Sequence, residues 1–153
     1  MFSFRDHLVT VTPVLAGAPG QPVTLGTAYR LLSGNKIALD PGASADHVAG
    51  FGELPFDIIR KSNKPKISLE GMDAVEVDAV RTRVGGIGGY KFFVSVVAQR
   101  PGVPMFTIKV MFCEWSGGGG YQGEEGGSTD KIEALATDIH MNGRSIYARR
   151  HPR

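Results

Sequence analysis

Glycine and proline divide this chain into short segments, and their distribution constrains the fold more than any other feature of the sequence. Glycine accounts for 21 of the 153 residues and proline for 9, so glycine is about twice as frequent as the roughly 7% of an average protein. The segments between these breaks are rich in β-branched and aromatic side chains. Since helices need longer uninterrupted periodic segments than strands do, the pattern predicts a mainly β protein.

The clearest predicted element is a β-hairpin formed by residues 90–99 and 105–115. The linking sequence at residues 100–104 contains a Pro-Gly pair, which supplies the backbone angles of a type II turn. The first strand is apolar on both faces, with Phe92 on one face and Phe93 on the other. Strands of that kind are usually covered on both sides. We therefore expect a covering layer from this chain or from another subunit.

Shorter alternating runs predict further antiparallel strands. The sequence Ser-Gly-Asn at residues 33–35 suits a hairpin turn between two of them, residues 23–32 and 36–39. Residues 74–84 also alternate, but the phase slips midway, as it does at a β-bulge. The remaining predicted strands are residues 8–15 and 66–70.

These strands predict a single antiparallel β-sandwich or β-barrel domain over residues 1–153, with long Gly/Pro-rich loops. We expect an extended arm at residues 40–55, a glycine-rich loop at residues 116–127 and a basic C-terminal tail at residues 148–153. The arm carries isolated apolar side chains, each of which costs about 1.5–3 kcal/mol if it is left in water. The arm is therefore expected to pack on another surface.

Residues 129–139 allow two structures. Their apolar side chains, from Ile132 to Ile139, follow the i, i+3, i+4, i+7 pattern of an amphipathic helix. The competing structure is a strand through residues 134–141, a turn at the Asn-Gly pair 142–143 and a return strand. The sequence thus predicts at most one short helix, near residues 129–139.

Charge and cysteine content limit the partners and the environment. A formal net charge of +2 and a pI of about 8.8 neither require nor exclude a polyanion, so nucleic acid is not a required partner. Cys113 is the only cysteine, so no intrachain disulfide can form. We expect no secretory signal peptide and no membrane partner, because no apolar run approaches the ~18 residues of a membrane helix.

The sequence predicts no catalytic residue, cofactor site or metal site. Residues 118–123 match G-x-G-x-x-G, but Glu124 and Glu125 follow where a dinucleotide phosphate needs a helix N-terminus. A glycine-rich surface loop is therefore favoured there. The four histidines lack the spacing of a zinc site, and no serine lies in a G-x-S-x-G sequence.

An acidic cluster at residues 70–78 is the candidate site for an enzymatic alternative. If residues 74–84 form a strand, Glu76 and Asp78 share one face with their side chains ~7 Å apart. Paired carboxylates of this kind serve glycosidases and divalent metal sites. A solvated strand face, with Arg81 and Arg83 as counter-charges, is favoured over such a site.

The chain resembles the small β-barrel or β-sandwich proteins of bacteriophage particles, such as tail-tube subunits and head-decoration proteins. The resemblance rests on size, glycine content, the hairpin with long loops and the basic tail rather than on a motif, so it assigns no functional residue. It implies a non-enzymatic structural subunit of a virion, tail tube ahead of head decoration. Its expected partners are copies of itself and, as further candidates, other virion proteins.

The predicted assembly interface consists of apolar side chains from the region of the arm and from the hairpin. Two alternatives stay open: a small-molecule or carbohydrate-binding β-barrel with the glycine-rich loop at its mouth, and an enzyme that uses the acidic cluster. The predicted interface residues are Val48, Phe51, Leu54, Phe56, Phe93 and Val97.

Overall fold

The structure is a computed structural model that describes residues 7–48, 57–60, 63–100, 103–118, 120, 122–124 and 127–147. Within these residues the protein is mainly β, as the sequence predicts, with a single short helix. The elements in chain order are β1 (His7–Ala16), β2 (Thr24–Leu25), β3 (Tyr29–Leu31), β4 (Lys36–Asp40), β5 (Ala45–Val48), β6 (Asp57–Arg60), β7 (Lys66–Met72), α1 (Ala74–Val84), β8 (Phe92–Arg100), β9 (Val103–Gly118), β10 (Gln122–Glu124), β11 (Gly127–Leu135), β12 (Asp138–Met141) and β13 (Arg144–Ser145).

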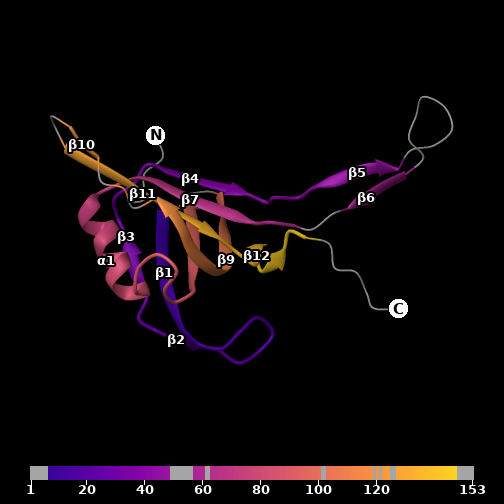
Figure 1. The fold of residues 1–153 in the computed structure, drawn as a ribbon, viewed down its shortest axis with the longest axis horizontal. Coiled ribbons are helices and arrows are strands. Elements are labelled where there is room, and N and C mark those ends of the chain that lie inside the picture. Colours follow the sequence, from indigo (N-terminus) through magenta and orange to yellow (C-terminus); the bar gives the residue numbers. More distant parts are fainter. Residues whose placement is uncertain are drawn as a thin grey trace.

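Eleven of the described strands form one antiparallel sheet, seven of them in the order β2-β1-β8-β9-β11-β7-β4 (Figure 1). The other four pair beside this path: β3 with β1, β10 with β11, β12 with β9, and β13 with β12. The predicted hairpin is confirmed, because β8 and β9 pair from Arg100↔Val103 to Phe92↔Cys113. The long strand β9 then continues past this hairpin and pairs with β11 through Trp115. It therefore belongs to both halves of the sheet, one built on β1 and β8 and the other on β11, β7 and β4.

The main core lies between the inner faces of these two halves. Valines of β1, β8 and β9 face Leu69 of β7, Ile132 of β11 and Trp115, and all of these side chains are buried. Helix α1 contributes valines to the same core and packs against β11 and β1 (Figure 1). A fully buried Leu31 brings the short strand β3 into this core.

Residues 74–84, predicted as a strand with a bulge, form helix α1 instead. Asp73 caps the helix by accepting a hydrogen bond from the Val75 N–H at 3.1 Å, and Gly85 ends it with a φ of 80°. The slip in the alternation reflects the helical period, which places residues three and four apart on one face. Capping and burial outweigh the low helix propensity of valine. The buried side chains occupy one face of the helix: Val77, Val80 and Val84.

The helix predicted near residues 129–139 is wrong, because this segment forms β11 and β12. Ile132 and Ala134 are buried while Glu133 between them faces outward, which is the alternation of a strand. Both edges of β11 are paired, with β7 on one side and β9 on the other. The competing prediction is correct for the turn, since β12 and β13 flank Asn142 and Gly143, both with positive φ.

Residues 33–35 do not make the predicted hairpin turn. Strand β3 pairs with β1, whereas β4 pairs with β7, so the linking residues cross from one half of the sheet to the other. The segment predicted as a glycine-rich loop contains the end of β9 and the whole of β10, which pairs with β11. The predicted basic tail at residues 148–153 lies outside the described residues.

Strands β5 and β6 form a separate two-stranded antiparallel ladder, here called the β5–β6 ladder. Its register runs from Ala45↔Arg60 to Val48↔Asp57. A hydrogen bond of 3.1 Å from the Lys64 N–H to the Gly42 carbonyl joins its base to the β4–β7 ladder. Figure 1 shows the β5–β6 ladder extending away from the main sheet, on a line that continues β4 and β7.

Candidate assembly surfaces and an apolar pocket

The outer surface of β1, β8 and the first part of β9 is nearly free of charge. Rows of side chains cross it, with Leu8 opposite Val97 and Thr10 opposite Ser95. Charged side chains lie at its sides: Arg30 lies opposite Thr10, Lys109 lies opposite Ser95, and Asp138 and His140 of β12 lie beyond β9, opposite Met111 and Lys109. We call this surface the threonine face, and its members are Leu8, Thr10, Thr12, Phe93, Ser95, Val97 and Thr107.

A small apolar cluster supports one end of the threonine face. The rings of Phe93 and Phe112 meet edge to face at 5.0 Å between centroids, and both pack against Val14. Phe112 reaches this cluster because its φ of 48° places it on the outer side of β9, next to Met111. The Lys109 ammonium lies 5.0 Å from the Phe93 ring centroid, at cation–π distance.

The outer surface of β4, β7, β11 and the second part of β9 has the opposite character. Lysines and carboxylates come together on it, across strands in the ion pair Lys36–Glu70 at 3.4 Å and along β11 in the ion pair Lys131–Glu133 at 3.0 Å. Ser68 sits at its centre, half-buried, as Ser95 does on the threonine face. We call this surface the charged face, and its ionisable members are Lys36, Asp40, Lys66, Glu70, Glu114, Lys131 and Glu133.

Two of the six predicted interface residues lie on the threonine face. Val97 is half-buried there, and Phe93 is buried in the apolar cluster, so Val97 exposes more of its side chain than Phe93 does. Val48 lies in β5, but its side chain is not described. The other three, Phe51, Leu54 and Phe56, fall outside the described residues.

The periodicity of single strands does not reveal the threonine face as a unit. The signal that identifies it is the absence of charge: residues 8–16 and 92–99 contain no Asp, Glu, Lys or Arg. Both segments alternate, so periodicity assigns each strand its own two faces. Only the antiparallel pairing of β1 with β8 brings the two uncharged strands side by side.

The acidic cluster does not form a carboxylate pair. Because α1 is a helix with 3.6 residues per turn, Glu76 and Asp78 point about 200° apart around its axis. The prediction that they share one face is therefore wrong. Each carboxylate of the cluster has a structural contact instead: Asp73 caps α1, Asp78 pairs with Arg81 at 3.1 Å, and Glu70 pairs with Lys36.

Glu76 holds the segment that links the two halves of the sheet. Its carboxylate accepts hydrogen bonds from the Leu32 N–H at 2.9 Å and from the Ser33 N–H at 2.6 Å, as well as from the Ser33 hydroxyl. The Asp73 N–H donates to that same hydroxyl oxygen at 2.9 Å. These contacts, here called the Glu76 clasp, fasten the link between β3 and β4 to the first turn of α1.

Asp138 contacts a serine and a histidine in the β12–β13 turn region. It accepts a hydrogen bond from the Ser145 hydroxyl at 2.7 Å and lies 2.9 Å from Nε2 of His140. The carboxylate lies between the two, whereas a nucleophile–base pair requires the serine to bond the histidine directly. The arrangement therefore orders the turn and resembles no nucleophilic site.

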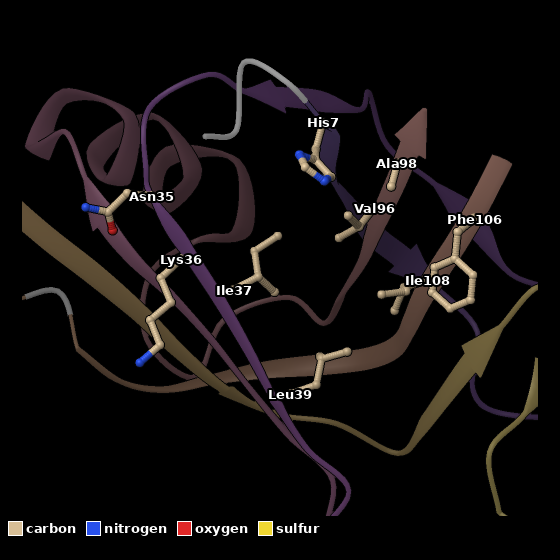
Figure 2. Close-up of a pocket in the computed structure, with 9 residues that line it drawn as sticks. All are labelled: His7, Asn35, Lys36, Ile37, Leu39, Val96, Ala98, Phe106 and Ile108. Atoms are coloured by element: carbon tan, nitrogen blue, oxygen red, sulfur yellow. The ribbon is translucent and has the colours of Figure 1, made fainter. Parts of the chain in front are cut away.

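An apolar pocket of about 420 Å³ opens between β4 and the β8–β9 hairpin. Figure 2 shows Ile37 and Leu39 of β4 facing Val96, Ile108 and the other side chains of the hairpin across this space. His7, Asn35 and Lys36 supply the polar atoms of the lining.

Cys113 lies buried in β9 beneath both faces. Burial raises the pKa of its thiol to about 12, and a hydrogen bond involving the backbone of Val94 offsets only part of that rise. A thiol with such a pKa stays protonated and unreactive near neutral pH. Within the part of the chain that the structure describes, no group of His, Cys, Asp and Glu side chains is arranged to hold a metal ion, and no helix is long and apolar enough to span a membrane.

Comparisons with known proteins give one likeness of fold. No protein-family model matches the chain, and no curated protein matches its sequence. Among solved structures, the chain is similar to one in the cryo-EM structure of the anti-feeding prophage baseplate, six-fold symmetrised. The TM-score is 0.52 at 11% sequence identity, and the match covers 90% of this chain and 93% of that chain. At this identity the likeness concerns the fold, and it extends over nearly the whole of both chains.

Proposed function

We propose that this protein is a structural, non-enzymatic subunit that assembles with copies of itself into a phage-tail-like particle. A role in the tail tube is favoured over a role in head decoration. The observation that carries the proposal is the β5–β6 ladder. An isolated two-stranded ladder is at best marginally stable in water, and this one extends away from its own sheet (Figure 1). A neighbouring subunit would supply the surface that it lacks.

Two further observations support a particle subunit. The fold is similar over 90% of the chain to a subunit of the anti-feeding prophage baseplate. The carboxylates of the acidic cluster are occupied by structural contacts, which leaves the enzyme alternative without a pair of free acids. The proposed partners are therefore other copies of this chain and other components of the same particle.

Electron microscopy and sedimentation velocity of the purified protein test the proposal. We expect rings or tubes at high protein concentration. In a variant that replaces residues 45–60 by a short Gly/Ser loop, the hydrogen bond between Lys64 and Gly42 stays in place, and we expect folded monomers with an unchanged β-type circular dichroism spectrum. A wild-type protein that remains monomeric, or a shortened variant that assembles normally, would contradict the proposal.

The apolar pocket favours a second candidate, a small-molecule binding protein. Its volume of about 420 Å³ lies within the range of roughly 300–1,000 Å³ found for ligand sites. This candidate predicts saturable binding of an apolar fluorescent probe by the monomer, and loss of that binding when Ala98→Trp fills the space. Binding that does not saturate, or that survives the substitution, would argue against it.

A further inference from the structure

We infer that the threonine face is the docking surface for the β5–β6 ladder of a second copy of this chain. The inference rests on the proposed self-assembly and adds the surface that receives the ladder. The ladder extends away from its own body (Figure 1), so the face that it covers belongs to another molecule.

The threonine face shares its lack of central charge with the centre of a protein–protein interface. Interface centres are depleted in charged residues, while the surrounding rim is polar and hydrated. On this face Leu8 is 42% exposed beside the half-buried Val97, with serine and threonine side chains between the apolar ones. The two basic residues, Arg30 and Lys109, lie at the sides of the surface.

The chain segment that contains the ladder is complementary in charge and polarity. Residues 45–60 contain three acidic residues and one arginine, which suits a surface with Arg30 and Lys109 at its sides, where the nearby Asp138 is paired with His140. The same segment is rich in large apolar residues, which an uncharged centre would cover. They are Val48, Phe51, Leu54, Phe56, Ile58 and Ile59.

The threonine face is long enough to receive the ladder. Each strand of the ladder has four residues, so its first and last Cα atoms are about 10 Å apart at roughly 3.4 Å per residue. The same rise gives about 14 Å from Leu8 to Thr12 along β1. A contact between the ladder of one copy and the face of the next joins two different surfaces, and contacts of that kind build rings or open helical tubes.

Matched serines allow a direct test. Ser95 and Ser68 are both half-buried and central, one on the threonine face and one on the charged face. We expect Ser95→Glu to raise the concentration needed for assembly at least about tenfold, because it places an acid against an acidic segment. Ser68→Glu should change it by less than about twofold. Thermal unfolding of both variants separates loss of assembly from loss of folding.

A charge rescue and a cross-link identify the occupant. The Ser95→Glu variant that also carries Asp46→Asn and Asp57→Asn should regain part of the assembly that Ser95→Glu alone loses. A diazirine-bearing aliphatic residue at position 97 should cross-link, between isotope-labelled and unlabelled copies, to the tryptic peptide Ile37–Arg60, which contains the whole segment. The same residue at position 135 on the charged face should not.

The outcomes separate the inference from the function on which it rests. If the wild-type protein assembles but Ser95→Glu assembles equally well and position 97 captures another peptide, the docking surface is wrong and the proposed function stands. If the wild-type protein does not assemble at all, both are wrong.

Discussion

The threonine face and the charged face are built from the same sheet and share strand β9, yet they differ in almost every side chain. One has an uncharged centre with its charged residues at the sides, whereas the other pairs lysines with carboxylates across its strands. Both contain alternating strands, so alternation alone does not distinguish them. The comparison teaches that the distribution of charge between paired strands, rather than the apolarity of single strands, distinguishes the two faces.

The two faces also differ in what lies beneath the exposed side chains. The threonine face is supported by the outer cluster of Val14, Phe93 and Phe112. The charged face has no comparable cluster among the described residues, and its one large exposed apolar side chain is Leu135, 46% exposed. A truncation on each face should therefore have very different effects on stability.

The largest expected effect is that of Phe93→Ala. Because Phe93 is buried against Phe112, its loss leaves a cavity and should lower the free energy of unfolding by about 3 kcal/mol or more. The matched truncation Leu135→Ala removes an exposed side chain and should cost at most about 1 kcal/mol. Urea unfolding measures both. Equal effects would mean that the outer cluster does not support its face.

The next effect tests whether the two halves of the sheet depend on one another. Glu76→Ala removes the clasp on the link between β3 and β4 and leaves the Leu32 and Ser33 N–H groups without their acceptor. We expect a loss of about 1.5–3 kcal/mol. Glu76→Gln keeps one acceptor oxygen and should lose less. Thermal unfolding distinguishes the variants, and an unchanged stability in Glu76→Ala would show that the clasp is dispensable.

A smaller effect depends on pH and reports on the strand that both faces share. The pKa of Cys113 rises from 9.0 to about 12 on folding, so the unfolded chain releases this proton first. The contribution of Cys113 to the free energy of unfolding is fully present below pH 9 and is lost as the pH rises towards 12. Between pH 9 and 10 the loss should be about 1 kcal/mol.

The comparison with Cys113→Ala isolates this contribution, since other groups titrate equally in both proteins. The difference in free energy of unfolding between the two proteins should shrink as the pH rises above 9. A constant difference from pH 8 to pH 10 would contradict the raised pKa. Slow labelling of native Cys113 by a thiol reagent, compared with the unfolded chain, gives an independent measurement.

The smallest effect is expected on the charged face. Glu70→Gln breaks the ion pair with Lys36 at 3.4 Å, in which both side chains are partly exposed. Exposed pairs contribute about 0–1 kcal/mol and weaken with salt. The variant should therefore differ little from wild type at low ionic strength and still less at high ionic strength. A loss above about 2 kcal/mol would show that this face is stabilised by its charges.

The sequence predicted the fold class because strands leave a local signature. Alternation in residues 66–70 and the Pro-Gly turn near residue 102 each depend on neighbouring residues, and they place β7 and the β8–β9 hairpin correctly. Local periodicity gives the wrong secondary structure for residues 129–139, because apolar residues at helical spacing lie there in a strand that is paired on both edges. Pairing is a long-range property that a periodic pattern does not encode.

The candidate surface was only partly predictable for the same reason. Phe93 and Val97 could be placed on one face of one strand, but the partners Thr12 and Leu8 come from a strand more than eighty residues earlier in the chain. The helix α1 was missed because its four valines favour strands in isolation. The N-cap at Asp73 and the αL glycine at residue 85 were the local signals that could have revealed it.

The continuity between the β5–β6 ladder and the β4–β7 ladder has a mechanical consequence. Pulling the ladder along its length draws β4 and β7 in the same direction and loads the hydrogen bonds between β7 and β11 in shear, so the pairs from Ile132↔Leu69 to Leu135↔Lys66 resist together instead of opening one by one. Leu39 and Ile67 carry that load into the core. In the proposed assembly, tension between neighbouring subunits would therefore be transmitted through the β5–β6 ladder into the core of each subunit.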